Sequence, residues 1–139
     1  MLDNLFGQKR NYKALHLEVR QSLIHGKGVF SKTAFKAGQL IEKAPVILID
    51  DEEKNLLRHS SLHYYYFLVN YPAKPIAMGL GYSALYNHAA DANAGYCINL
   101  VNLSISIKAC KKIAEGEEIT INYNGRPNDP SPVYFSINN

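Results

Sequence analysis

The sequence predicts a mostly β domain, built from many short strands with one helical insertion in its middle. Short apolar runs with alternating or β-branched residues recur along the chain, and only one stretch of about twenty residues has helical spacing. The length of 139 residues fits one hydrophobic core. Apolar residues make up 47% of the chain and charged residues 19%, which is the mixture of an ordinary globular domain.

Three strands are expected before the helical insertion. The run ALHLEVR alternates apolar and polar residues from Ala14 to Arg20, and the runs GVFS and QLIEKAPVILI follow it, separated by the turn-prone KAG at Lys36 to Gly38. Pro45 lies inside the last run. Because proline cannot donate to a strand ladder, it favours an edge position or a bulge.

The helical insertion is expected between Asp51 and Asn70. Acidic residues open this stretch, where they suit the positive end of a helix. Leucine and phenylalanine recur at near-helical spacing, and Asn70 followed by Pro72 supplies a stop. A break around Ser60 and Ser61 would divide the stretch into two short helices.

Strand character returns after the insertion. Residues Cys97 to Cys110 indicate two short strands with Asn102 at or near the turn, and the run EEITINY, ending at Tyr123, is the last strong strand. The following NGRPNDPSP holds three prolines and a glycine, which predicts an irregular loop leading to VYFSINN.

Charge and apolar patterning exclude several classes of protein. The net charge is +3, and the basic residues are spread along the chain instead of forming the dense patch typical of a nucleic-acid site. The apolar runs are far shorter than the roughly 18 to 20 residues that span a bilayer, and the amino terminus lacks a signal-peptide pattern. We therefore expect an intracellular protein, cytoplasmic or nuclear, with no direct nucleic-acid site and no membrane segment.

The cysteines and histidines do not indicate a metal site. Cys97 and Cys110 have no CxxC spacing, so we expect both to be reduced strand residues and no metal to be bound. The histidines are scattered, and no GxSxG elbow indicates a serine triad.

Three short motifs are the candidates for chemistry. HGKGVF starts at His25, LYNHAADANA contains Asn87 and His88, and GEEITINY ends at Tyr123. Taken singly, each has a plain structural explanation: a β-turn for the first, hydrogen bonding within a buried loop for the second, and core packing for the third. The residues alone leave a structural and a functional explanation open for each motif.

Together, the order and spacing of these motifs resemble the SET domain, the fold of protein-lysine methyltransferases, from about Leu15 to Phe135. The resemblance is closest to the compact viral SET domain of a large algal virus, which similarly has AMALGFGAIFNHSKDPNA where this chain has AMGLGYSALYNHAADANA. It implies a SET-domain fold of the β-clip type with a C-terminal pseudoknot. The chain would be one domain over 1–139, with a core at about 15–125 and a channel-closing tail at 126–139.

The resemblance also implies roles for individual residues around S-adenosylmethionine (AdoMet). Asn87 would bind the amino group of the cofactor, and the backbone of His88 its adenine edge. Tyr123 would lie where the lysine channel meets the sulfonium, with Tyr65 as a second catalytic tyrosine of the channel. The residues expected to bind the cofactor are Gly26, Lys27, Gly28, Asn87, His88 and Tyr123, and those expected to line the substrate channel are Tyr65, Tyr134 and Phe135.

The implied activity is AdoMet-dependent methylation of a lysine side chain in a histone or another basic protein. Ala89 stands where the family often has serine or cysteine, and Ala92 stands where it usually has proline. Asp91 and Asn93 would brace the loop. These departures leave an alternative open, a catalytically weak SET domain that binds a lysine-bearing tail or partner. A β-clip ligand-binding module without the cofactor is a more distant alternative. The viral resemblance also makes a homodimer worth testing.

Overall fold

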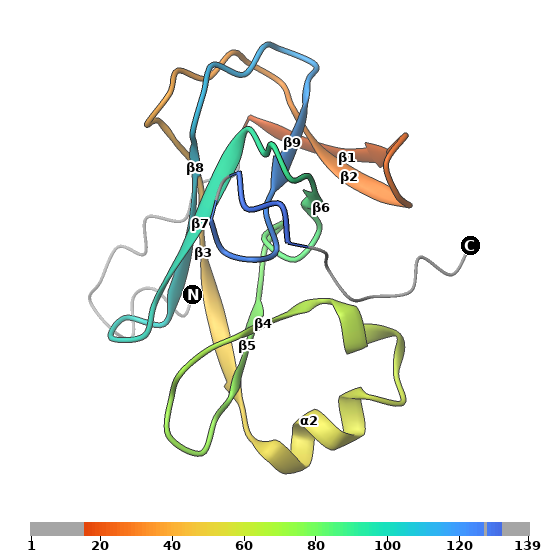
Figure 1. Cartoon of the computed structure of the whole chain (residues 1–139), viewed down its shortest axis with the longest axis vertical. Coiled ribbons are helices and arrows are strands. Elements are labelled where there is room, and N and C mark those ends of the chain that lie inside the picture. Colours follow the sequence, from red (N-terminus) through yellow and green to blue (C-terminus); the bar gives the residue numbers. More distant parts are fainter. Residues whose placement is uncertain (1–15, 127, 132–139) are drawn as a thin grey trace, which may run out of the picture.

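A computed structural model gives the structure of the chain and describes residues 16–126 and 128–131 (Figure 1). Its order of elements is mostly β, as the sequence predicts. The elements are β1 (Leu17–Gln21), β2 (Lys27–Ser31), β3 (Leu40–Ile49), α2 (Asp51–Leu57), the 3-10 helix η1 (Ser61–Tyr64), β4 (Tyr66–Leu68), β5 (Ile76–Gly79), β6 (Asn87–His88), β7 (Ala94–Asn99), β8 (Ser104–Ala109) and β9 (Glu118–Ile121).

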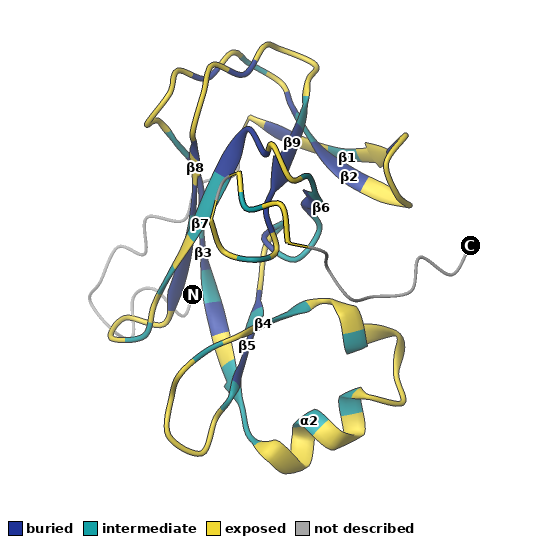
Figure 2. Ribbon diagram, in the orientation of Figure 1, coloured by how far each residue is buried: buried dark blue, intermediate teal, exposed yellow. Residues whose placement is uncertain are grey.

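The strands form two small sheets. One has the order β1-β2-β9-β6 and the other β4-β5-β3-β8-β7. All pairs are antiparallel except β6 and β9, which run parallel. Both sheets contribute to one hydrophobic core, seen as the dark blue segments of β2, β3, β8 and β9 in Figure 2. Its fully buried members include Val29, Phe35, Ile41, Ile105, Ile107, Ile113, Ile119 and Ile121.

The prediction that Pro45 lies at an edge or a bulge is wrong. Strand β3 is central in its sheet, so Pro45 does not lie at an edge, and the irregularity of the ladder falls between Leu40 and Glu42 instead. Residues up to Pro45 pair with β8, and from Val46 onward they pair with β5. The missing N–H therefore falls where the strand changes partner, while the carbonyl of Pro45 accepts from N of Leu80 at 2.9 Å.

The helical insertion is shorter than expected. Helix α2 begins with a capping box, in which Asp50 accepts from N of Glu53 at 2.9 Å and Glu53 accepts from N of Asp50 at 3.4 Å. The predicted break at Ser60 is confirmed, because Ser60 caps η1. The prediction is wrong for residues 66–68, which pair with β5 as β4, since an aromatic run suits a strand better than a helix.

The later strands follow the prediction. β7 and β8 form a hairpin whose turn spans Leu100 to Leu103, and Oδ1 of Asn99 accepts from the backbone N of Val101 and Asn102. Cys97 lies in β7, whereas Cys110 follows β8 directly, and both are exposed free thiols. Residues 14–15 and the run VYFSINN lie outside the described residues, as does part of the C-terminal tail at 126–139. Among the helices that are described, none has the length and apolar character to cross a membrane.

Candidate active site

Sheet order brings the three sequence motifs together. β9 lies between β2 and β6, so the GEEITINY motif is flanked by the HGKGVF and Asn-His motifs. Val29 pairs with Ile119 on one side, and Asn87 pairs with Thr120 on the other. The last motif and the Asn-His loop therefore lie side by side.

The carboxylate of Glu118 links all three motifs. It accepts from Oγ of Ser22 at 2.9 and 2.8 Å and from Nδ2 of Asn87 at 2.8 Å. Gly28 makes room for it, because a Cβ at that position would collide with Oε1 of Glu118 and lie 3.0 Å from Nδ2 of Asn87. The second glycine of the HGKGVF motif is thus required by close packing.

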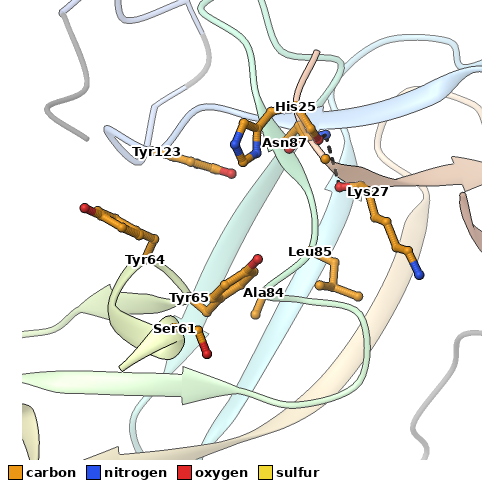
Figure 3. Close-up of a pocket in the computed structure, with 10 residues that line it drawn as sticks. His25, Lys27, Ser61, Tyr64, Tyr65, Ala84, Leu85, Asn87 and Tyr123 are labelled. Carbon is orange, nitrogen blue, oxygen red and sulfur yellow. Dashed lines mark hydrogen bonds between the residues drawn. The ribbon is translucent and has the colours of Figure 1, made fainter. Parts of the chain in front are cut away.

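The side chain of Asn87 has a fixed orientation. Its Nδ2 donates to O of Lys27 at 3.3 Å (Figure 3), to O of His25 at 3.0 Å and to Glu118. A flipped amide would place its oxygen against three acceptors, so Nδ2 must face them. Within the described residues, every side-chain hydrogen bond of Asn87 comes from Nδ2, and Oδ1 is left to accept from a cationic ligand group.

Asn93 braces the loop that follows the Asn-His pair, whereas Asp91, in the same loop, makes its contact at the protein surface. Nδ2 of Asn93 donates to O of Glu118 at 2.8 Å, and Oδ1 accepts from N of Thr120 at 2.9 Å. Asp91 makes an exposed ion pair with Lys111 at 2.7 Å.

The two alanines that depart from the family pattern fit this loop. N of Ala89 donates to O of Ile121 at 3.1 Å, which continues the pairing of β6 with β9. Ala92 is buried, so a small side chain suits its position. The bent loop therefore forms with alanine at both places.

His88 supports Tyr123 from the side. Nδ1 of His88 accepts from the backbone N of Tyr123 at 3.1 Å, and the two ring centroids lie 5.2 Å apart. Burial lowers the pKa of His88, which favours the neutral ring that this acceptor role needs. Its side chain lines neither of the cavities described below.

Tyr123 is held by a backbone carbonyl. Its hydroxyl donates to O of Tyr86 at 2.7 Å. Burial, followed by the electrostatic influence of Tyr65 and Glu118, raises the pKa of Tyr123 to about 12. The hydroxyl therefore stays protonated at neutral pH and cannot act there as a base.

Two adjoining cavities meet at this tyrosine. The first has a volume of about 430 Å³ and is lined by the first motif, Asn87 and Leu85. The second has a volume of about 490 Å³ and is lined mainly by aromatic residues, including Tyr66, Phe67, Tyr86 and Tyr96. Their shared lining residues are Tyr64, Tyr65, Ala84 and Tyr123. In Figure 3, Tyr64 and Tyr65 lie across the first cavity from Tyr123.

The structure gathers most of the predicted site residues. Gly26, Lys27, Asn87, Tyr65 and Tyr123 line the first cavity, although the Lys27 side chain extends away from the rings in Figure 3. Gly28 lies against Glu118 and Asn87, and neither it nor His88 lines either of these two cavities. Tyr134 and Phe135 lie outside the described residues. No cluster of three or more potential metal ligands occurs in 16–126 or 128–131.

Sequence reasoning missed the residues that connect the motifs. Glu118 is part of the quoted GEEITINY motif, yet its position gives no sign that it reaches Ser22 and Asn87. Tyr86 belongs to the LYNHAADANA motif and Tyr96 lies outside all three motifs, and neither was expected to line the second cavity. The excess of tyrosine, with 10 residues against 5 phenylalanines, was the available signal for an aromatic site.

The donor set of the first cavity suits AdoMet. The volume lies within the range of small-molecule sites, the fixed Oδ1 of Asn87 can accept from an ammonium group, and the glycine turn lets a ligand approach the backbone. Gly26 has a φ of 45°, and a Cβ there would have no atom within 4 Å, so the space beside the turn is open.

Comparisons with known proteins agree with this arrangement. A histone-lysine N-methyltransferase of Schizosaccharomyces pombe, specific for H3 lysine-37, is 29% identical over 108 residues, which cover 77% of this chain and 72% of that protein. The crystal structure of a candidate histone methyltransferase of Plasmodium falciparum has a TM-score of 0.64 and 29% identity, covering 78% of this chain and 92% of that chain.

A chain of an apo ctPRC2 structure with mutations in Ezh2 has a TM-score of 0.67 and 25% identity, covering 84% of this chain but only 16% of that chain. The SET domain family itself matches residues 26–124, which include all three motifs except His25. The chain therefore belongs to the SET domain family, whose lysine methyltransferases take their methyl group from AdoMet.

Proposed function

We propose that this chain transfers a methyl group from AdoMet to a lysine side chain of a histone or another basic protein. One observation carries the proposal: two cavities of different chemistry share a wall that contains Tyr65 and Tyr123. The first would hold the cofactor, and the aromatic second cavity would admit the lysine. The two reacting groups would then meet beside Tyr123.

On the cofactor side, Asn87 and the glycine turn do the binding. Oδ1 of Asn87 would accept from the cofactor's ammonium group, while the backbone around Gly26, Lys27 and Gly28 would approach its methionine end. His88 would contribute its backbone at the adenine edge. When bound, AdoMet supplies an electrophilic methyl group on a positive sulfonium.

On the substrate side, the aromatic cavity favours the neutral amine. A lysine with an ordinary pKa near 10.4 must lose a proton before it can attack, which costs about 4 to 5 kcal/mol at pH 7. Desolvation between Tyr65, Tyr86 and Tyr96 and the nearby positive charge both lower that pKa. Aromatic faces also suit a methyl group with partial positive charge.

Tyr123 would orient the amine. Its hydroxyl hydrogen is directed to O of Tyr86, so the oxygen lone pairs are positioned to accept from the lysine nitrogen. Because the pKa of Tyr123 is raised to about 12, its contribution is positioning, and the lysine proton leaves to solvent. Tyr65 would complete the wall, and Tyr134 or Phe135 would close the channel.

The identity of the substrate rests on the relatives. The fission yeast relative is specific for H3 lysine-37, and the Plasmodium relative is a candidate histone methyltransferase, which favours a histone tail and a nuclear location. The domain plan of a core at about 15–125 with a closing tail at 126–139, the closeness to the compact viral SET domain and a homodimer stay predictions.

The test combines cofactor binding with product detection. AdoMet affinity is measured by calorimetry, and histone H3, other histones and lysine-rich peptides are incubated with the protein and AdoMet before mass spectrometry. We expect added methyl groups on lysine. Tight binding with no methyl added to any substrate, or to the protein itself, would contradict the enzyme and favour the catalytically weak binding module.

Variants locate the chemistry. Tyr123→Phe should lower the rate of methylation by about tenfold or more, because it removes one hydrogen bond that orients the amine. AdoMet affinity should change less than about twofold. Tyr71→Phe, at an exposed tyrosine away from the cavities, is the matched control and should leave both unchanged. Unchanged turnover in Tyr123→Phe would exclude the assigned role.

A further inference from the structure

A buried acid lies behind the wall of the aromatic cavity. Glu42 on β3 is only 1% exposed. Its Oε2 accepts from the hydroxyl of Tyr86 at 2.7 Å, and its Oε1 accepts from the backbone N of Tyr82 at 2.8 Å. None of the ion pairs formed by the described residues includes it. A buried carboxylate without a cation costs stability, so its contribution must come from the groups it holds.

These two hydrogen bonds fix both ends of the segment from Tyr82 to Tyr86. The segment precedes Asn87 directly and forms part of both cavity walls. Gly81, with a φ of 64°, makes the contact possible, because a Cβ there would lie 2.5 Å from Oε1 of Glu42. Gly81, before the Asn-His motif, therefore serves the approach of this acid.

The same segment holds Tyr123. The hydroxyl of Tyr123 donates to the carbonyl of Tyr86, the residue whose side chain Glu42 holds. A connected path therefore runs from the carboxylate through Tyr86 to the hydroxyl beside the shared wall. Burial and the charge of Glu42 raise the pKa of Tyr86 well above its usual value, so Tyr86 keeps the proton it donates.

We propose that Glu42 is a positioning residue for methyl transfer, which fixes the Tyr86 carbonyl so that Tyr123 presents its oxygen to the substrate amine. The proposal rests on the proposed function of Tyr123. Glu42 touches neither cavity, so it acts only through Tyr82 and Tyr86. A purely structural role would weaken folding alone, whereas positioning requires an effect on turnover that depends on Tyr123.

The test uses Glu42→Gln, which keeps the size of the side chain and an acceptor for N of Tyr82 but removes the charged acceptor from Tyr86. We expect kcat to fall by about tenfold, as for one charge-assisted hydrogen bond, with AdoMet affinity within about twofold of the wild type. Combined with Tyr123→Phe, Glu42→Gln should cause less than about a twofold further loss, because both changes act on one hydroxyl. Glu115→Gln, at an exposed acid, is the control.

A second measurement does not depend on turnover. In protein labelled with ¹³C at the tyrosine ring carbon that bears the hydroxyl, the Tyr123 resonance, assigned by its loss in Tyr123→Phe, should shift in Glu42→Gln and stay in Glu115→Gln. If Glu42→Gln fails to fold, Tyr86→Phe removes the same hydrogen bond and takes its place.

The outcomes separate the two proposals. An unchanged Tyr123 resonance overturns the role of Glu42, as does a Glu42→Gln factor in kcat that is equally large with Phe at position 123. If the wild-type protein transfers no methyl group, the proposed function fails, and the resonance alone decides whether Glu42 positions Tyr123.

Discussion

Gly28 provides the sharpest test of how the site is built. Replacing it by alanine adds a Cβ that would collide with Oε1 of Glu118 and lie 2.9 Å from its Cδ. The carboxylate must move, and it then gives up its hydrogen bonds with Ser22 and Asn87. The small change at Gly28 is therefore expected to loosen all three motifs at once.

The magnitude follows from those contacts. Hydrogen bonds to a charged group contribute about 1.5–3 kcal/mol each, and the half-buried position of Glu118 favours the lower end, which gives a loss of about 3 kcal/mol. Alanine also restricts the unfolded chain, which offsets about 0.4–1 kcal/mol. We expect Gly28→Ala to lower the free energy of unfolding by about 2 kcal/mol and AdoMet affinity by about tenfold, since Asn87 loses its charged partner.

Urea denaturation and calorimetry measure the two effects, and a double-mutant cycle identifies their cause. Glu118→Ala removes the two atoms nearest to the new Cβ and leaves Nδ2 of Asn87 at 3.0 Å, so Gly28→Ala should then cost less than about 0.5 kcal/mol. An equal cost in both backgrounds would refute the role of Glu118 as the link.

Two further predictions concern the loop and the tyrosine. Asn93→Ala should lower the free energy of unfolding by about 2–3 kcal/mol in denaturant titration, because it leaves the buried N of Thr120 unpaired and removes the donor to the partly buried O of Glu118. Asp91→Ala removes an exposed ion pair with Lys111 and should cost less than about 1 kcal/mol. Similar losses in the two variants would contradict this difference. Tyr123 should ionise near pH 12, seen as tyrosinate absorbance missing in Tyr123→Phe. Because the folded state holds this proton more tightly than an ordinary tyrosine at 10.0, its contribution to stability is complete below pH 10 and is lost as pH rises towards 12, and a group ionising at 10 would contradict this burial.

Local features of the fold could be predicted from the sequence. The β7–β8 turn near Asn102 and the break at Ser60 depend on residues adjacent to them, and the prediction located both. The extended state of Tyr66 to Leu68 depends on pairing with β5, which a helical spacing of leucines does not reveal. The place of Pro45 likewise depends on two partner strands that lie on opposite sides of β3.

The site was predictable as a set of motifs but not as a network. Asn87 and Tyr123 stand out because the motifs contain them, and the resemblance to a family supplied their expected roles. The link through Glu118 joins residues 22, 87 and 118, and it exists only because β9 lies between β2 and β6. The hydrogen bond between Glu42 and Tyr86 joins residues 44 positions apart in the chain. Such contacts depend on tertiary structure, which periodicity does not encode.

The parallel pairing of β6 with β9 has a consequence for how the protein folds. β6 is a two-residue strand whose only partner in the described sheets is β9, and β9 is also the strand that joins it to the β1–β2 hairpin. Long-range pairings of this kind form slowly, because the chain loses the entropy of closing a large loop before the strands gain their hydrogen bonds. During synthesis, the first two motifs leave the ribosome well before Glu118, so the cofactor cavity is expected to assemble only after β9 has emerged. AdoMet would then bind late in folding, only to chains in which β9 has already paired with β2 and β6.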